Sequence, residues 1–150
     1  MINGVEVRKL KIYHDTRGWL TEIYRQDETN YRPVMAYLSE TKPGVVRGPH
    51  EHKNQSDFFV FLAGKFKLYL WENRKNQKNY RKFQTFIVGG KNPCSVLIPP
   101  GVVHAYQCVS QPPGLIVNFP NRLFMGKGRK QKVDEIRWEV DLKSPFIVKN

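Results

Sequence analysis

The chain has 150 residues, of which 40% are hydrophobic, and it carries a formal net charge of +12. This length suits one domain, residues 1–150, with a single core. No run approaches the ~20 apolar residues of a membrane helix, and the first residues lack the apolar segment of a secretory signal, so we expect a cytoplasmic protein without membrane contact. The basic residues are scattered, which argues against nucleic-acid binding, but the same charge would attract a diphosphate-bearing small molecule.

Short β-rich runs recur along the chain, and glycine and proline turns such as Gly89-Gly90 separate them. Many short strands with such turns are typical of an all-β sandwich or barrel. The segment 122–132 is basic and contains glycine, which predicts an exposed loop or short helix. Cys94 and Cys108 fit no zinc motif, so we expect both to be reduced core residues. The predicted strands are 5–12, 18–25, 34–40, 57–62, 65–71, 82–88, 95–98, 103–109, 115–119 and 136–142.

Three of the four histidines form a pattern. His50 and His52 are two residues apart, so on a strand both side chains point to the same face. His104 follows the tight turn Pro99-Pro100-Gly101. If the shared face lines a barrel, His104 can meet the other two from a neighbouring strand. His14 lies outside the pattern and is expected to be an ordinary surface side chain.

The spacing from Gly44 through His50, His52 and Asp57 to Gly64, followed by the block that ends at His104, resembles the two-part cupin signature. This resemblance implies an all-β, double-stranded β-helix of the cupin or jelly-roll type. The histidines would then face the interior of the barrel.

A narrower resemblance covers nearly the whole chain. Residues 15–22, 45–50, 98–106 and 136–138 resemble, in order, four sequence blocks of the dTDP-4-dehydrorhamnose 3,5-epimerases. Residues 47–53 are also similar to the Arg-Gly-x-His-Ala-His-Lys block of dTDP-sugar 3,4-ketoisomerases. These resemblances imply an enzyme that removes a proton next to the ketone of a dTDP-4-keto-6-deoxy sugar. They also imply a homodimer that needs no cofactor.

The resemblance assigns roles to individual residues. His50 would be the general base, and His52 would be a second base if the product is a ketoisomer. Arg47 would bind the diphosphate, because a guanidinium makes a permanently charged, bidentate contact. The family's acid is a tyrosine that is missing from its usual place in this chain, and Tyr106 or Tyr37 would replace it. The remaining substrate contacts would come from His104, Asn118, Arg17 and Glu22, the last two across a dimer contact.

Three departures from the epimerase pattern leave the product open. Asp57 stands where the epimerases carry a lysine, and no tyrosine occurs near Val117-Asn118, where they carry their catalytic acid. Val140 occupies the place of their histidine-orienting aspartate, with Asp141 one position later.

Two other interpretations compete with the epimerase. His50, His52, Asp57 and His104 match the three-histidine, one-carboxylate spacing of metal cupins, so a divalent transition metal and an oxygenase or metal-dependent isomerase are the first alternative. A non-catalytic sugar-binding cupin is the second.

Overall fold

The computed structural model describes residues 1–148, and nearly all regular structure in that range is β-strand. The strands are β1 (Glu6–Lys9), β2 (Ile12–Asp15), β3 (Gly18–Thr21), β4 (Tyr37–Thr41), β5 (Val46–Glu51), β6 (Asp57–Ala63), β7 (Lys65–Glu72), β8 (Phe83–Gly89), β9 (Cys94–Ile98), β10 (Val102–Cys108), β11 (Gly114–Asn118) and β12 (Ile136–Arg137). The helical elements of this range are three short 3-10 turns, η1 (Gln26–Glu28), η2 (Lys127–Arg129) and η3 (Trp138–Val140). The predicted all-β class is therefore confirmed.

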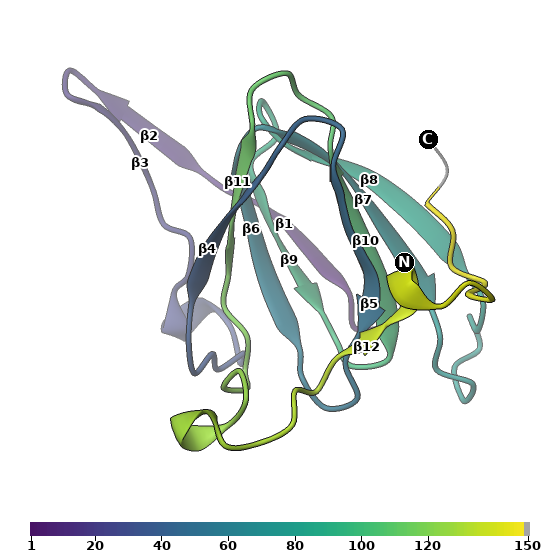
Figure 1. Ribbon diagram of the computed structural model, residues 1–150. Coiled ribbons are helices and arrows are strands. Elements are labelled where there is room, and N and C mark those ends of the chain that lie inside the picture. The colour runs from purple at the N-terminus through teal and green to yellow at the C-terminus, as the bar shows by residue number, and fades with distance from the viewer. Residues whose placement is uncertain (149–150) are drawn as a thin grey trace.

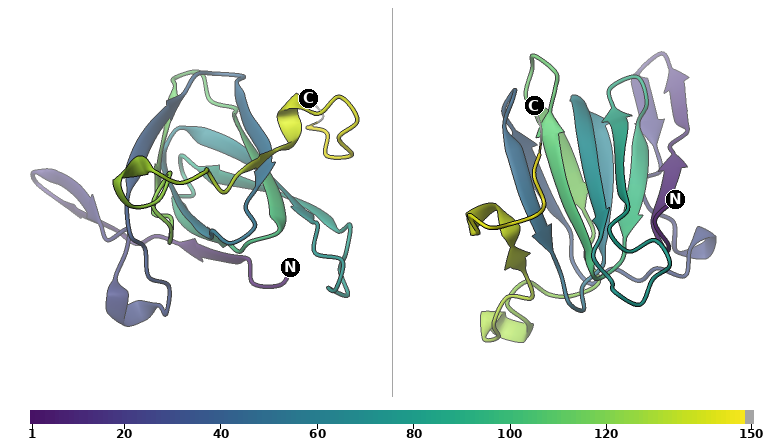
Figure 2. Two further views of the ribbon diagram at one scale, coloured as in Figure 1. Left: turned by 60° about the horizontal axis from the view of Figure 1, so that its bottom comes forward. Right: turned by 90° about the vertical axis from the view of Figure 1, so that its right-hand side faces the viewer.

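Two five-stranded antiparallel sheets enclose the core (Figure 1). One sheet has the order β1-β9-β6-β11-β4, and the other has the order β12-β5-β10-β7-β8. The left view of Figure 2 shows that together they form a barrel. Strands that are neighbours in a sheet are mostly distant in the sequence, so the chain alternates between the two sheets. This is the predicted jelly-roll arrangement.

Strand β7 shows why its sequence changes from an alternating to a continuous apolar pattern. Phe66, Leu68 and Leu70 are fully buried in the core between the sheets. Trp71 points to the other face, where its ring contacts the ring of Phe146, with centroids 5.9 Å apart. Because both faces are covered, the strand has apolar residues on both.

The neighbouring strands β5 and β10 carry His50 and His104, and His52 directly follows β5. Their register pairs His50 with His104 and, beyond a bulge, Arg47 with Tyr106. Between them, Gly48 has a φ of 85°, and a Cβ added there would lie 2.6 Å from the main-chain oxygen of His104. Only glycine permits this approach of the two strands.

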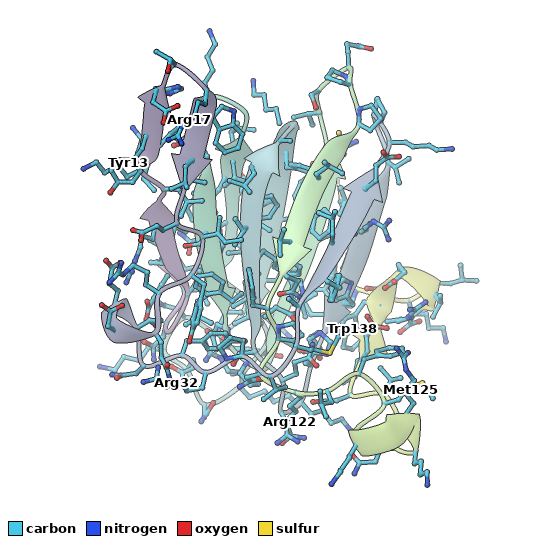
Figure 3. All side chains as sticks on the ribbon, turned by 90° about the vertical axis from the view of Figure 1, so that its left-hand side faces the viewer. Tyr13, Arg17, Arg32, Arg122, Met125 and Trp138 are labelled. Carbon is cyan, nitrogen blue, oxygen red and sulfur yellow. The ribbon has the colours of Figure 1, made fainter. Side chains whose placement is uncertain are left out.

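Strands β2 and β3 pair with each other and form a hairpin that projects from the barrel (Figure 1). Arg17 lies near the tip of this hairpin, as Figure 3 shows. Trp19 and Leu20 are 59% and 61% exposed. His14 is exposed as well, as the sequence predicted.

The observed strands differ from the predicted ones at several places. The predicted strand 18–25 ends at Thr21 as β3, and the predicted strand 34–40 begins only at Tyr37 as β4. The predicted strand 5–12 is divided between β1 and β2. The predicted strand 136–142 is wrong beyond Arg137, because η3 begins at Trp138. Strand β5 was not among the predicted runs, since Gly48 and Pro49 resemble turn residues.

The two cysteines and the segment 122–132 agree with the sequence-based expectations. Cys94 and Cys108 are buried and unpaired. The segment 122–132 is a loop that contains η2. Within residues 1–148, the structure has no helix that combines the length and apolar character needed to span a bilayer.

Candidate active site

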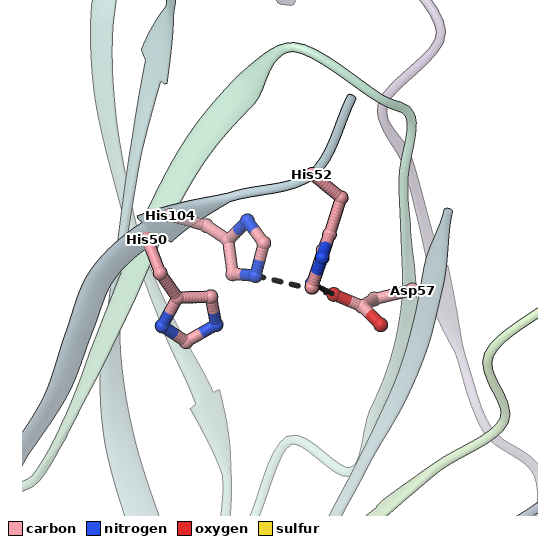
Figure 4. A group of neighbouring side chains, drawn as sticks. All are labelled: His50, His52, Asp57 and His104. Atoms are coloured by element: carbon pink, nitrogen blue, oxygen red, sulfur yellow. Dashed lines mark ion pairs between the residues drawn. The ribbon is translucent and has the colours of Figure 1, made fainter. Parts of the chain in front are cut away.

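The three predicted histidines converge inside the barrel, as Figure 4 shows. His50 lies in β5, His52 directly follows that strand, and His104 comes from β10. The ring centroids of His50 and His104 are 4.4 Å apart, and the ring of His52 lies 5.9 Å from the first and 6.0 Å from the second. Imidazoles from two separate stretches of chain therefore meet inside the barrel, as the sequence predicted.

Asp57, at the start of β6, joins the cluster from the opposite sheet and is 2% exposed. Its Oδ2 lies 3.1 Å from His52 Nε2 and 3.3 Å from His104 Nε2. The second contact is close, yet it lacks hydrogen-bond geometry, and His104 Nε2 is buried without a hydrogen-bond partner. The other carboxylate oxygen, Oδ1, accepts hydrogen bonds from the amides of Gln55 at 2.9 Å and Asn118 at 2.8 Å.

Main-chain carbonyls fix two of the imidazole rings. His52 Nδ1 is hydrogen-bonded to the carbonyl oxygen of Asp134, and His104 Nδ1 lies 3.1 Å from the carbonyl oxygen of Val102. Because a carbonyl oxygen only accepts, Nδ1 carries a hydrogen in both rings. The Asp134 carboxylate in turn accepts the main-chain N–H groups of residues 53–55 at 2.8–3.0 Å. The C-terminal segment thus holds the loop that follows His52.

The cluster moves the pKa values of its members in different directions. Burial alone would raise the pKa of Asp57, but the adjacent His104 and His52 hold it well below its usual range. Burial would lower the pKa of His52, yet the hydrogen bond and the charge of Asp57 raise it. For His50, burial and the nearby His104 both lower the pKa well below the ordinary value. A neutral His50 can accept a proton.

An open cleft leads to this cluster between β4 and β5, and the C-terminal segment 120–139 borders it. His50 and His52 line the cleft, whereas His104 lies behind them. The lining is cationic, with seven basic side chains against three acidic ones. The basic residues are Arg47, Lys53, Arg122, Lys127, Arg129, Lys132 and Arg137, and the acidic residues are Asp134, Glu135 and Glu139.

Several predicted substrate-binding residues also line the cleft. Arg47 is one of them, and its guanidinium donates hydrogen bonds to the Thr41 hydroxyl at 3.1 Å and the Glu40 carbonyl at 2.8 Å. Tyr106 and Tyr37 both border it. Burial raises the pKa of each tyrosine, so both hydroxyls stay protonated at neutral pH.

Asn118 lies in a different position from the one its predicted substrate contact requires. The residue is fully buried behind Asp57. Its amide N–H groups point to Asp57 and to the Tyr37 hydroxyl, and its oxygen accepts the main-chain N–H of Phe58. Because its donors and its acceptor are engaged, Asn118 positions the Asp57 carboxylate instead of contacting a substrate.

Arg17 and Glu22 lie outside the cleft of their own chain. Arg17 pairs with Asp15 on the projecting hairpin, and Glu22 pairs with Arg25 at 2.9 Å. Figure 3 shows Arg17 at the end of the molecule opposite Arg122, which borders the cleft.

Sequence reasoning missed the residues that support the histidines. Gln55 and Asp134 have no motif around them, and Asp134 reaches the cluster through an irregular segment. Asp141, which follows the place of the family's orienting aspartate, accepts the main-chain N–H of Lys143. Within residues 1–148, no carboxylate is hydrogen-bonded to the His50 ring.

Comparison with known sequences identifies the family. A family model described as dTDP-4-dehydrorhamnose 3,5-epimerase matches residues 1–125. The probable low-salt glycan biosynthesis epimerase Agl13 of Haloferax volcanii is 35% identical over 126 residues, which cover 82% of this chain and 81% of that protein.

Two solved structures share the fold at low sequence identity. The dTDP sugar isomerase from Desulfovibrio desulfuricans G20 superposes with a TM-score of 0.84 at 19% identity, covering 97% of this chain and 91% of that one. The dTDP-6-deoxy-D-glucose-3,5-epimerase of Legionella pneumophila Philadelphia 1, solved with dTDP-4-keto-L-rhamnose, has a TM-score of 0.76 at 20% identity, with coverages of 89% and 71%.

The jelly-roll barrel, its histidine-lined cleft and these relatives define a cupin-type enzyme of the sugar-nucleotide epimerase kind. The match to the family model over residues 1–125 identifies the family within this class. The chain belongs to the dTDP-4-dehydrorhamnose 3,5-epimerase family.

Proposed function

We propose that the chain epimerises a dTDP-4-keto-6-deoxy sugar, with His50 as the base that removes the proton beside the ketone. The observation that carries this proposal is the position of His50. Its ring faces the cleft, and within residues 1–148 its ring nitrogens have no hydrogen-bond partner, whereas both neighbouring histidines are held at Nδ1 by main-chain carbonyls. A free imidazole in a cleft can take a proton from a carbon acid.

The surroundings of His52 favour epimerisation over ketoisomerisation. A carbonyl shift along the sugar needs a second base that can accept and deliver a proton at the neighbouring carbon. His52 is only 8% exposed, and its two ring nitrogens face the Asp134 carbonyl and Asp57. We therefore assign His52 to the support of the site and leave His50 as the base.

Tyr106 is the proposed acid for the opposite face of the sugar. It pairs with Arg47 across β5 and β10 and lies two residues from His104. Tyr106 borders the cleft, and burial raises its pKa, so the hydroxyl keeps the proton that an acid needs. Tyr37, on the β4 side, already accepts a hydrogen bond from Asn118 at 3.0 Å.

The cationic lining supports a diphosphate-linked substrate. Arg47 lies on the same strand as His50, and its guanidinium can take a phosphate in the bidentate manner. The seven basic side chains around the cleft would concentrate a dianionic ligand near the base. Proton abstraction by a side chain requires no organic cofactor.

A homodimer and a cytoplasmic location complete the proposal. The projecting hairpin, with exposed Trp19 and Leu20, has apolar surface available for a second copy. Such a dimer would carry Arg17 and Glu22 toward the partner's nucleotide. Sedimentation at micromolar concentration should give a dimer, and a monomer alone would contradict this part. The unpaired Cys94 and Cys108 fit a reducing compartment.

Proton exchange tests the proposed reaction. The protein is incubated with dTDP-4-keto-6-deoxyglucose in deuterated water, and NMR follows loss of the C3 and C5 proton signals. We expect rapid exchange at one or both carbons, about 10²–10⁴-fold slower exchange in His50→Gln, and an unchanged rate in His14→Gln, the exposed control. Substrate binding without exchange by the wild-type protein would indicate a binding module and contradict the proposal.

A further inference from the structure

The polar side chains packed around His50 inside the barrel are engaged with one another. His52 and His104 are each hydrogen-bonded through Nδ1 to a main-chain carbonyl, and the Nε2 atoms of both rings face the Asp57 carboxylate. Removal of a proton beside a ketone places negative charge on the ketone oxygen, and enzymes stabilise such charge with hydrogen-bond donors that are fixed in advance. An oxygen beside His50 therefore needs a donor from outside this cluster.

Arg137 lies beside His50 on the neighbouring strand β12. The register of β12 and β5 places the two residues directly opposite each other. In such an antiparallel pair, the Cβ atoms are ~4.5–5.5 Å apart and both side chains point to the same face of the sheet. Both residues border the cleft. Burial and His104 lower the pKa of His50 most, and the positive charge of Arg137 lowers it further.

One edge of the Arg137 guanidinium is held and the other is open. Its Nε donates a hydrogen bond to Glu135 Oε2 at 2.6 Å, and the Arg137 side chain is 63% exposed. Within residues 1–148, no hydrogen bond occupies Nη1 or Nη2 of Arg137. Because the guanidinium is planar and its N–H groups have fixed directions, the two outer nitrogens can donate to one oxygen in the cleft.

The contact with Glu135 distinguishes Arg137 from the other basic residues of the cleft. Of the seven basic side chains in the lining, Arg137 alone forms an ion pair with a residue of the described range 1–148. Since the pair has no net charge, it attracts a phosphate dianion less than the unpaired Arg129 or Lys127 does. Its outer N–H groups still form hydrogen bonds that strengthen as an oxygen gains negative charge. These properties suit a ketone oxygen, which is neutral in the substrate and negative in the enolate.

Arg137 lies between two anchored residues of the C-terminal segment. On one side, the Asp134 carboxylate accepts the main-chain N–H groups of residues 53–55. On the other side, the ring of Trp138 packs against the ring of Phe146, with centroids 5.0 Å apart. A donor on a segment held in this way needs little reorganisation when charge develops. Arg137 lies outside residues 1–125, which match the family model.

We propose that Arg137 is a catalytic residue that donates hydrogen bonds from Nη1 and Nη2 to the ketone oxygen as the enolate forms. This inference rests on the proposed epimerisation. A ring nitrogen of His50 takes the proton from the carbon beside the ketone, and the electron pair of the broken C–H bond forms the carbon–carbon double bond of the enolate. The π pair of the carbonyl moves to the oxygen, where Arg137 stabilises it. Return of a proton to carbon restores the ketone, so no oxidant or second reactant is needed.

Proton exchange and nucleotide binding together test this role. Exchange beside the ketone of dTDP-4-keto-6-deoxyglucose is measured in deuterated water at saturating substrate, and calorimetry gives the Kd for dTDP. Arg137→Gln should slow exchange about 10²–10³-fold, as loss of an oxyanion donor does, and leave the Kd for dTDP unchanged. The control Arg32→Gln, at an exposed residue bonded to its own loop, should change neither value.

Two results would overturn the role of Arg137. One is exchange by Arg137→Gln at the wild-type rate. The other is a raised Kd for dTDP with unchanged exchange at saturation, which would assign the guanidinium to the diphosphate. Both differ from failure of the proposed function, in which the wild-type protein itself shows no exchange.

A second variant tests the positioning of the guanidinium. Glu135→Gln keeps Arg137 but replaces the carboxylate that holds its Nε, so exchange should slow less than in Arg137→Gln. A larger loss in Glu135→Gln than in Arg137→Gln would show that the carboxylate acts by itself, which also contradicts the proposal.

Discussion

Trp138 Nε1 donates a hydrogen bond to Oε1 of Glu51 at 3.2 Å, and this contact fastens the C-terminal segment to the strand that carries His50. Glu51 is 6% exposed, and its carboxylate also accepts the amide of Asn73 at 3.0 Å and 3.2 Å. The same C-terminal segment supplies Asp134, which holds His52. The shape of the site therefore depends on residues beyond the barrel strands.

The Trp138 contact predicts a measurable loss of stability. Trp138→Phe keeps an aromatic ring against Phe146 but removes the donor to a buried carboxylate, so the free energy of unfolding should fall by about 1–3 kcal/mol. Trp19→Phe, at an exposed position, should change it by less than about 0.5 kcal/mol. Urea unfolding measures both, and equal effects would show that the Trp138 contact does not stabilise the chain.

Asp134 predicts a dependence of stability on pH. Burial would raise the pKa of its carboxyl, but the N–H groups of residues 53–55 outweigh burial and lower it. A carboxyl whose folded pKa is lower than its unfolded pKa, ~3.9, stabilises the fold above that pH, and the stabilisation is lost as the pH falls toward the folded pKa. The wild-type protein should therefore be more stable than Asp134→Asn at pH 7 and lose this advantage below about pH 4.

Unfolding at several pH values checks this prediction. Asp141→Asn is the matched control, because Asp141 is exposed and its carboxylate accepts the main-chain N–H of Lys143. A stability difference between wild type and Asp134→Asn that stays constant from pH 7 to pH 3 would contradict the proposed hydrogen-bonding role of the carboxylate.

Arg47 should govern the affinity for nucleotide. Replacing its guanidinium in Arg47→Ala removes a bidentate phosphate contact worth about 1.5–3 kcal/mol, so the Kd for dTDP should rise about 10–150-fold. The exposed Arg32, which hydrogen-bonds to its own loop, provides the control Arg32→Ala with unchanged affinity. Calorimetry measures both Kd values. Equal values for the two variants would show that Arg47 does not bind the phosphate.

The hydroxyl of Tyr106 should be needed to return a proton to the sugar but not to remove one. Tyr106→Phe keeps the ring in its aromatic contacts with Phe59 and Phe66 but removes the acid, so net epimerisation should fall about 10²–10⁴-fold while exchange next to the ketone continues. Tyr37→Phe should retain most of the epimerisation. If Tyr37→Phe shows the large loss and Tyr106→Phe does not, the acid comes from β4.

The sequence predicted the architecture well because the signals are local. Alternating apolar residues and glycine or proline turns mark most strands, and the two-residue spacing of His50 and His52 places both on one face. The spacing to His104 then predicted the convergence, since the barrel brings β5 and β10 together. Strand β5 was not predicted. The close approach to His104 requires glycine at position 48, and glycine is also common in turns.

The supports of the site could not be predicted in the same way. Asp134 reaches His52 from 82 residues away, and it lies in the irregular stretch just before β12. Asn118 was expected to meet substrate, but whether an amide faces a cleft or a buried carboxylate depends on side-chain packing. Such long-range polar contacts leave no periodic pattern in a single sequence.

A crystal structure with a bound dTDP-4-keto-6-deoxy sugar, or with an unreactive analogue, tests the central claim most directly. We predict the diphosphate at Arg47 and a carbon next to the carbonyl about 3–3.5 Å from a ring nitrogen of His50. A nucleotide sugar bound outside the cleft, or with its ketone turned away from His50, would contradict the assignment of this imidazole as the base.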